Sequence, residues 1–437
     1  MSIIKAPGTK ILLFVLTFIN FTPVFSQTQS GTPVSPKYKI SFSERFRIEA
    51  WDNSTSLSNT ANAGSSYTRN RSSLMGQWFP KYKLELALKF TNEFRSYFTP
   101  SNKQFNIDEL FIDQLYFKWT NIAGTQATLM FGRQNISLGE GFLIMDGGPL
   151  DGSRSGYFNA IRAGYQFRPK LNLTAFYSVQ NKTDDILPVI NKKSKPLTDQ
   201  NEKAGAFYLN CDFGSRNFQT YYIRKDAKNT AVWPRSEINA IGERTQSPII
   251  KNLTLTFEGT YEFGKMGVAD MAAYGGYAYL TWQAPWPKRY LLSLTVGTIY
   301  LSGDDPNSAK YEGWDPLYGR WPKWSESYIY TLSKENGVAY WTNLSSLYGK
   351  MQIEIAKNVK YSFDYHYLSA PQKAPGSSAF TGGQGKHRGE LGISKLTYQI
   401  NKTVSGHIIW ENFNPGSYYF AGANAANWMR IEFMLSL

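Results

Sequence analysis

The chain has 437 residues and a formal net charge of +14, with 16% aromatic and 18% charged residues. A disordered chain is excluded, because such chains are poor in aromatic residues and rich in charge. A bundle of membrane-spanning helices is also excluded, because no run of about 18 apolar residues follows the N-terminal segment. The composition favours a β-rich fold in which apolar and polar side chains alternate.

Residues 1–26 are typical of a secretory signal peptide. Lys5 and Lys10 precede an apolar run over 11–19 that is too short to span a bilayer. We therefore expect export with cleavage near Ser26. A short N-terminal segment would follow over 27–36, and the folded part would extend from 37 to 437.

From Lys37 onward, segments of about 10–14 residues alternate between apolar and polar side chains, which is the pattern of a transmembrane β-barrel. The segment 81–95 shows the pattern best, with an apolar face made of Tyr82, Leu84, Leu86, Leu88, Phe90 and Phe94. The alternation predicts about eighteen strands, near 38–51, 66–78, 81–96, 109–120, 125–134, 158–168, 171–180, 203–213, 217–225, 236–246, 250–263, 271–283, 289–301, 341–356, 358–369, 386–399, 402–413 and 427–437.

The connections between these strands differ systematically in length. Every second connection is a tight turn, and the turns include 79–80, 169–170, 247–249 and 357. The intervening connections are long, notably 52–65, 135–157, 181–202, 302–340 and 370–385. Outer-membrane barrels have short periplasmic turns and long extracellular loops. We therefore predict an all-β, antiparallel transmembrane barrel of about eighteen strands with this orientation.

Aromatic residues at the strand ends fit girdles at the two membrane interfaces: Trp51, Trp78, Trp119, Trp282, Tyr300 and Trp410. Among the three histidines, His366 falls on the inward face of its strand, where a wall residue is a better interpretation than a catalyst. The loop acids Asp304, Asp305 and Asp315 do not match the EF-hand spacing and are expected to cap turns. With a single cysteine and no HExxH-type histidine spacing, we expect no metal and no other cofactor.

The inward positions nearest the long loops form a cationic wall on four adjacent strands, the last of which closes the barrel against the first. These positions are Arg45, Arg47, Glu49, Arg69, Arg71, Lys89, Glu93, Arg95, Arg430 and Glu432. Arg162 and Arg388, with Glu390, are expected to face inward at similar heights. Arg133 breaks the alternation, and we expect a bulge at Gly132 to turn it inward, because an arginine that faces lipid costs about 2–4 kcal/mol at mid-depth.

Several stretches resemble the alginate-export porin family of outer membranes. They are Phe131-Gly-Arg-Gln134, the glycine-rich 139–149, Ser302-Gly-Asp-Asp-Pro306 with Gly313-Trp-Asp-Pro316, and Trp410-Glu-Asn-Phe413. The resemblance spans residues 37–437. It implies a monomeric, eighteen-stranded barrel in the outer membrane of a Gram-negative-type bacterium, with outer-membrane lipid around it and a cationic lumen that passes a polyuronate.

The arginine-rich lumen favours passive transport of anions, because the planar guanidinium group pairs with carboxylate or phosphate in bidentate fashion. Basic residues are spread singly along the chain, so an anionic small molecule or polymer, such as alginate, is a better partner than nucleic acid. Two alternatives stay open: a general diffusion porin with an unselective polar lining, and a structural or adhesion barrel. A barrel enzyme such as a lipase is disfavoured, since only three histidines are available as a base.

Overall fold

The computed structural model describes residues 37–54, 56–61, 64–80, 83–103, 109–145, 156–190, 197–285, 292–319, 323–327, 342–373 and 382–437. The predicted signal peptide and the segment 27–36 lie outside the described residues, as do parts of the long loops. No described helix is long and apolar enough to cross a membrane.

The described residues form nineteen strands, of which eighteen are long and one, β8, has two residues. Their bounds are β1 Tyr38–Asp52, β2 Ser65–Trp78, β3 Leu84–Thr99, β4 Leu110–Thr120, β5 Ala127–Gln134, β6 Phe158–Arg168, β7 Leu171–Gln180, β8 Val189–Ile190, β9 Glu202–Asp212, β10 Asn217–Ala227, β11 Ser236–Ile250, β12 Leu253–Met266, β13 Ala269–Gln283, β14 Leu292–Leu301, β15 Leu344–Ala356, β16 Val359–Ser369, β17 His387–Gln399, β18 Val404–Pro415 and β19 Ala426–Ser436. A short 3-10 helix, Ile122–Gly124, joins β4 to β5.

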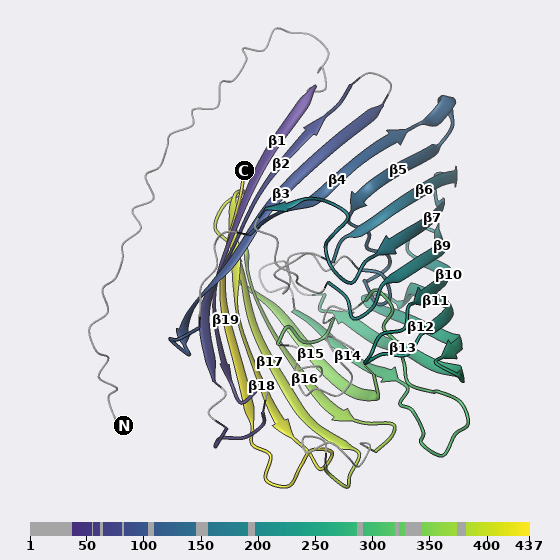
Figure 1. Cartoon of the computed structure of the whole chain (residues 1–437). Helices are drawn as coiled ribbons and strands as arrows, with labels where there is room; N and C mark the ends of the chain where they lie inside the picture. The colour runs from purple at the N-terminus through teal and green to yellow at the C-terminus, as the bar shows by residue number, and fades with distance from the viewer. Residues whose placement is uncertain are drawn as a thin grey trace. The chain divides into compact units, whose positions relative to one another are not determined.

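The strands close into a barrel, because β1 pairs antiparallel with both β2 and β19 (Figure 1). The eighteen long strands follow one another around the wall in chain order, and β8 pairs only with the end of β4. The predicted fold and strand number are therefore confirmed. The period-2 alternation gave the strand number because each strand buries one face and exposes the other.

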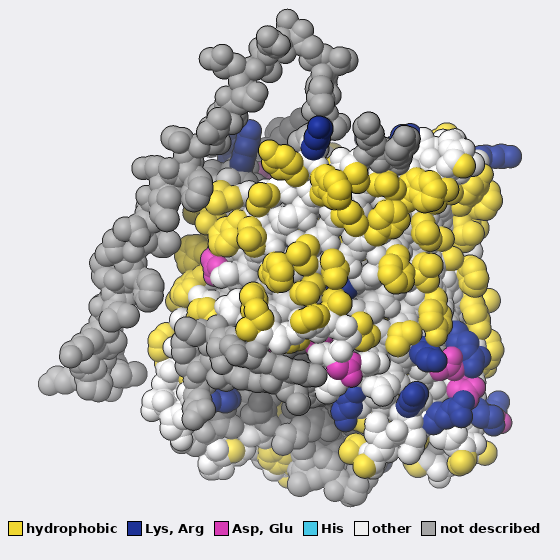
Figure 2. Space-filling view, turned by 45° about the horizontal axis from the view of Figure 1, so that its top comes forward, with side chains coloured by type: hydrophobic (Ala, Val, Ile, Leu, Met, Phe, Trp, Pro, Cys, Tyr) yellow, Lys and Arg dark blue, Asp and Glu magenta, His cyan; other side chains and the backbone are white. Residues whose placement is uncertain are grey.

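The two faces of the wall differ as the alternation predicts. On β12 the inward Thr256, Glu258 and Glu262 are buried, whereas Phe263 on the opposite face is exposed. Figure 2 shows apolar side chains spread over the outer surface, with charged side chains mainly at its margins. This outer surface suits contact with lipid acyl chains.

Most predicted tight turns are present, with one error. The chain does not turn at 247–249, because β11 continues to Ile250 and the turn falls at 251–252. Asn252 takes a φ of 64° there, and Asn358 takes 63° in the turn between β15 and β16. Asparagine tolerates this left-handed conformation better than most residues. On the opposite rim β12 and β13 are also joined tightly, so not every connection on that side is long.

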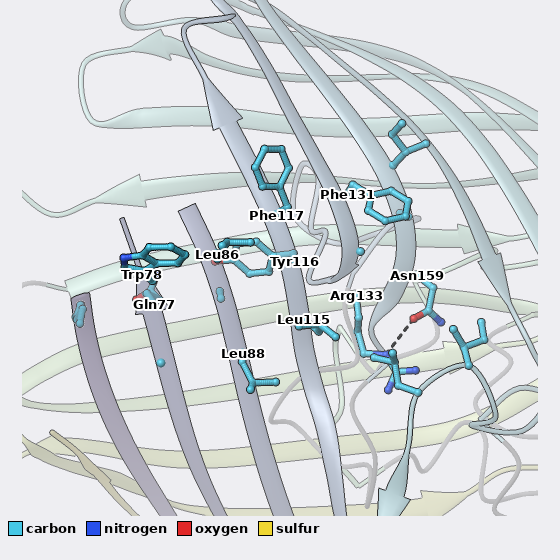
Figure 3. A pocket seen from close by; sticks show the side chains of 18 of the residues that line it. Gln77, Trp78, Leu86, Leu88, Leu115, Tyr116, Phe117, Phe131, Arg133 and Asn159 are labelled. Atoms are coloured by element: carbon cyan, nitrogen blue, oxygen red, sulfur yellow. Dashed lines mark hydrogen bonds between the residues drawn. The ribbon is translucent and has the colours of Figure 1, made fainter. Parts of the chain in front are cut away.

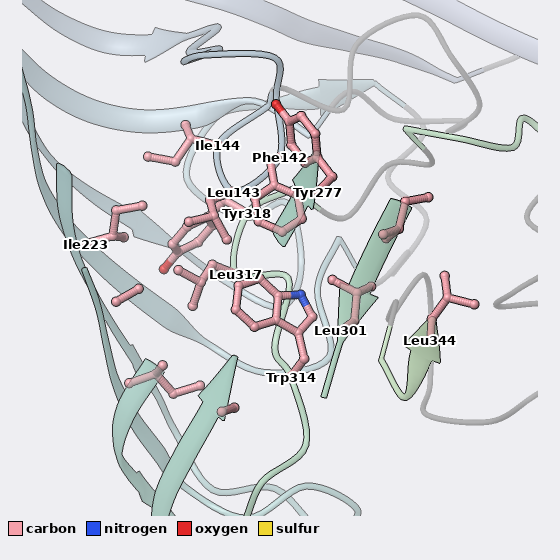
Figure 4. Close-up of a cluster of buried hydrophobic side chains, with 14 of the residues drawn as sticks. Phe142, Leu143, Ile144, Ile223, Tyr277, Leu301, Trp314, Leu317, Tyr318 and Leu344 are labelled. Carbon is pink, nitrogen blue, oxygen red and sulfur yellow. The ribbon is translucent and has the colours of Figure 1, made fainter. Parts of the chain in front are cut away.

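Two loop segments, 136–145 and 311–319, fold into the barrel and form an apolar plug against the inner faces of the wall strands (Figure 4). Phe142 stacks on Trp314 with ring centroids 5.4 Å apart, and both are buried. Wall residues such as Ile223 and Leu301 complete the cluster. The approach is so close that a Cβ added to Gly275 on β13 would lie 2.5 Å from the Trp314 ring.

Candidate functional site

The inward side chains of β19, β1, β2 and β3 form a continuous polar surface, which we call the arginine wall. It comprises Arg45, Arg47, Glu49, Arg69, Arg71, Lys89, Glu93, Arg95, Arg430 and Glu432. The strand register places its members side by side, since Arg45 lies opposite Arg71, and Arg71 lies opposite Glu93. The structure thus brings together ten of the fourteen residues that the sequence singled out.

Glu93 is the centre of the first half of the wall. Its carboxylate accepts hydrogen bonds from Arg69 Nε at 2.7 Å, Arg71 Nη1 at 2.9 Å and Arg45 Nη2 at 3.4 Å. Arg71 also donates to Asp113 on β4, whose carboxylate lies 2.8 Å from Lys89 Nζ. All of these groups except Lys89 are buried, which removes them from water at a cost in free energy. Their mutual ion pairs offset much of that cost.

Glu49 and Glu432 organise the other half. Arg430 Nε lies 3.3 Å from Glu49, and Arg47 Nε lies 2.5 Å from Glu432. His407 Nδ1 is 3.2 Å from the second oxygen of Glu432. The sequence interpretation missed His407 and Asp113 as members of the network. The register of β3 and β4 shifts beside Asp113, which hides it from the alternation.

Aromatic rings flank the cations of the wall. The Arg95 guanidinium lies 5.0 Å from the Tyr67 ring centroid, and that of Arg430 lies 4.5 Å from the Trp428 ring. Trp51 donates to the Tyr67 hydroxyl at 2.9 Å and packs against Trp428. Its assignment to an outer aromatic girdle is therefore wrong, because it joins the inward cluster.

Arg45 is the least satisfied cation of the arginine wall. Its side chain is 2% exposed, and its Nε and Nη1 have no hydrogen-bond partner among the described residues. Buried guanidinium groups are normally fully hydrogen-bonded, because an unmade bond to a charged group is costly. Nε and Nη1 lie on different edges of the guanidinium group, so each can donate a separate hydrogen bond. Arg45 therefore keeps donor capacity that no described residue uses.

Three of the remaining predicted site residues lie elsewhere. Arg388 is buried and donates to the carbonyl oxygen of Asn343 at 2.9 Å, so it fastens the start of β15. Arg162 is half-buried on β6 near Met130. The inward placement of Glu390 is wrong: a register shift at Arg388 reverses the alternation, and Glu390 lies opposite the outward Tyr367.

Arg133 fills a gap in the wall rather than lining the lumen. β5 pairs with both neighbours without a register shift, so the expected bulge at Gly132 is absent from these pairings. The guanidinium group donates to the carbonyl oxygen of Ile112 at 2.8 Å and to Asp184 at 2.8 Å. Burial under the loop that carries Asp184 avoids contact of a bare charge with lipid. Figure 3 also shows its bond to Asn159.

Beside Arg133, the outer face of the wall carries an apolar hollow of about 930 Å³ (Figure 3). Trp78, Leu86, Phe117 and Phe131 line it, and they belong to the outward face of their strands. The hollow therefore belongs to the lipid-facing surface and not to the arginine wall.

His366 and the three loop acids have the structural roles that the sequence predicts. His366 is buried on the inner face, where its Nδ1 lies 3.1 Å from Ser346 Oγ. Asp304, Asp305 and Asp315 each accept a backbone N–H of their own loop, as turn-capping residues do. The described residues contain no group of three or more His, Cys, Asp or Glu side chains that could hold a metal ion.

A described loop segment, 323–327, connects the plug to the arginine wall, and we call it the crossbar. At one end Lys323 Nζ lies 2.7 Å from Glu140 of the plug loop. At the other end Glu326 lies 2.6 Å from Lys395 Nζ and 2.5 Å from Arg430 Nη1. The crossbar therefore crosses the lumen from the side of β11–β13 to the side of β17–β19.

The family described as alginate export matches residues 38–373. The chain belongs to this family. No curated protein matches the chain in sequence.

Solved porins share the fold. OccAB3 of Acinetobacter baumannii superposes with a TM-score of 0.60 at 9% identity, over 92% of this chain and 99% of that chain. The outer membrane protein OpdK of Pseudomonas aeruginosa gives 0.58 at 11% identity, over 92% and 98%. The family and the fold together identify an outer-membrane barrel of porin type.

Proposed function

We propose that this barrel is a passive channel that favours anionic solutes, with carboxylates as the main class and acidic polysaccharides such as alginate within it. The observation that carries the proposal is Arg45, a buried guanidinium group with two donors that lack partners among the described residues. It belongs to a wall in which arginines outnumber the glutamates that neutralise them. Arginine keeps its charge at any physiological pH, so this surplus is permanent.

The mixed charge of the wall suits passage rather than trapping. Each glutamate of the wall competes with a passing anion for the same guanidinium donors, as Glu93 does for Arg45, Arg69 and Arg71. Conduction requires sites that bind an ion firmly enough to admit it and weakly enough to release it. The competition between glutamate and solute for the same donors supports weak, reversible binding.

The comparisons support the carboxylate class without assigning a solute. OpdK, which shares the fold at 10% identity, has been solved with vanillate, an aromatic carboxylate. The family description supports alginate as one candidate. A general porin is the second candidate function, because a polar lining is expected in any porin of this kind. We propose periplasmic short turns and extracellular long loops for the orientation.

The variant Arg45→Gln tests the proposal with little structural damage, since Glu93 keeps Arg69 and Arg71 as partners. In a planar bilayer with a salt gradient, the wild type should show a reversal potential of anion preference, and Arg45→Gln should move it toward zero. Arg235→Gln removes the same charge from an exposed rim position and serves as the control. A reversal potential that Arg45→Gln leaves at the wild-type value would favour the general porin.

A further inference from the structure

Lys395 and Arg430 stand on either side of Ile409 in one row across β17, β18 and β19. Neighbouring strands lie about 4.8 Å apart, so the two cations are two strand spacings apart with a short apolar side chain between them. A carboxylate can bridge the two cations by giving one oxygen to each. Glu326 does this, with Oε1 on Lys395 Nζ and Oε2 on Arg430 Nη1.

We infer that Lys395 and Arg430 form a carboxylate-binding subsite of the channel. In this structure the side chain of Glu326, from the crossbar, occupies the subsite in place of a carboxylate solute. The inference rests on the proposed anion channel and adds a defined site to it. Lys395 is not among the residues that the sequence analysis assigned to the pore, because the alternation counted from Arg388 places it on the outward face and the register shift beside Arg388 reverses this.

The crossbar is fastened to β18 by polar bonds between buried side chains. Glu411 on β18 accepts hydrogen bonds from the Ser325 hydroxyl at 2.6 Å and from the Glu326 backbone N–H at 2.7 Å. The Ser327 hydroxyl donates to the same carboxylate. These contacts are hydrogen bonds and ion pairs, whereas Trp324 packs against Phe142 and Tyr277 at the other end. The Glu326 end therefore makes the same kinds of contact that a carboxylate solute would make with Lys395 and Arg430.

A tethered carboxylate competes with a free one. Because Glu326 belongs to the same chain, its effective concentration at the subsite is in the millimolar range or above. A carboxylate solute must displace it, and its apparent affinity falls accordingly. Removing the charge of Glu326 while keeping its shape should therefore expose the intrinsic affinity of the Lys395–Arg430 pair.

The test is calorimetric titration of glucuronate, with glucose as the neutral probe, into the detergent-solubilised full chain. Glu326→Gln should bind glucuronate about tenfold more tightly than the wild type, and Glu326→Gln/Lys395→Gln should lose this increase. Asp305→Asn, which removes one charge from the same loop away from the subsite, should behave as the wild type. Glucuronate binding by Glu326→Gln that is no tighter than wild type, or an equal increase in Asp305→Asn, would overturn the inference.

If Glu326→Gln does not assemble into a heat-modifiable barrel, Ser325→Ala/Ser327→Ala replaces it, because this variant loosens the crossbar and leaves both cations in place. Tighter glucuronate binding by it supports the subsite, and unchanged binding refutes it. Calorimetry needs no conduction. Failure of the anion channel in the bilayer and failure of the subsite in solution are therefore separate results.

Discussion

Replacing Glu93 by Gln should be among the most destabilising single charge changes in the barrel. The Glu93 side chain is fully buried and holds three guanidinium groups, at 2.7, 2.9 and 3.4 Å. Glutamine keeps the volume but not the charge, so Arg45, Arg69 and Arg71 face one another without their shared anion. Breaking one buried pair costs about 3–5 kcal/mol. We expect a loss of at least this size, a large part of the stability of a typical folded domain.

Urea unfolding in detergent, followed by tryptophan fluorescence, measures the loss. The control is Glu237→Gln, because Glu237 pairs with Arg224 and Arg235 at a site where its side chain is 35% exposed. An exposed pair is worth less than about 1 kcal/mol. Adding Arg69→Gln to Glu93→Gln should recover part of the stability, since one uncompensated charge is removed. Exposed pairs set a margin of about 1 kcal/mol. If the free energies of unfolding of Glu93→Gln and of the control differ by less than this margin, the reasoning is refuted.

Two further predictions concern the crossbar and the wall. Burial raises the pKa of Glu326, but Lys395, Arg430 and His407 outweigh this and lower its pKa to about 2. The pKa of Glu326 in the folded chain lies below the ordinary 4.5. The ion pairs of Glu326 with Lys395 and Arg430 therefore hold the crossbar fully above pH 4.5 and are lost as the pH falls toward 2. Single-channel conductance should therefore stay constant from pH 8 to 5 and rise only below, and a rise at pH 6 would contradict the assignment. Gly132→Ala should lower the free energy of unfolding by about 1–3 kcal/mol, because Gly132 has a φ of 119° and its Cβ would lie 2.2 Å from the Leu115 carbonyl oxygen. Gly76→Ala, where a Cβ meets nothing within 4 Å, should leave stability nearly unchanged, and equal losses would refute the strain argument.

The strands and the arginine wall could be predicted because both follow from a local rule. Side chains alternate between the two faces of a strand, so the inward set on β1, β2 and β3 can be read from neighbours in the sequence. Arg45, Arg69 and Glu93 meet as expected. The register between strands then follows from burying one face and joining the strands in order.

The errors arise where pairing or distant contacts decide the outcome. Glu390 was placed inward because the register shift beside Arg388 leaves no local trace in the sequence. The plug depends on contacts such as that of Phe142 with Trp314, which are far apart in the chain and follow from no periodicity in the sequence. Glu326 likewise reaches Lys395 from a loop without periodicity.

The central claim is that the wall makes the channel select anions, and the reversal potential of the purified wild-type chain in a planar bilayer tests it most directly. With a tenfold KCl gradient at low salt, we expect a potential whose sign indicates chloride preference. The preference should shrink as the salt rises toward 1 M, where the Debye length is about 3 Å. A potential of zero at low salt, or one that indicates potassium preference, would contradict the account.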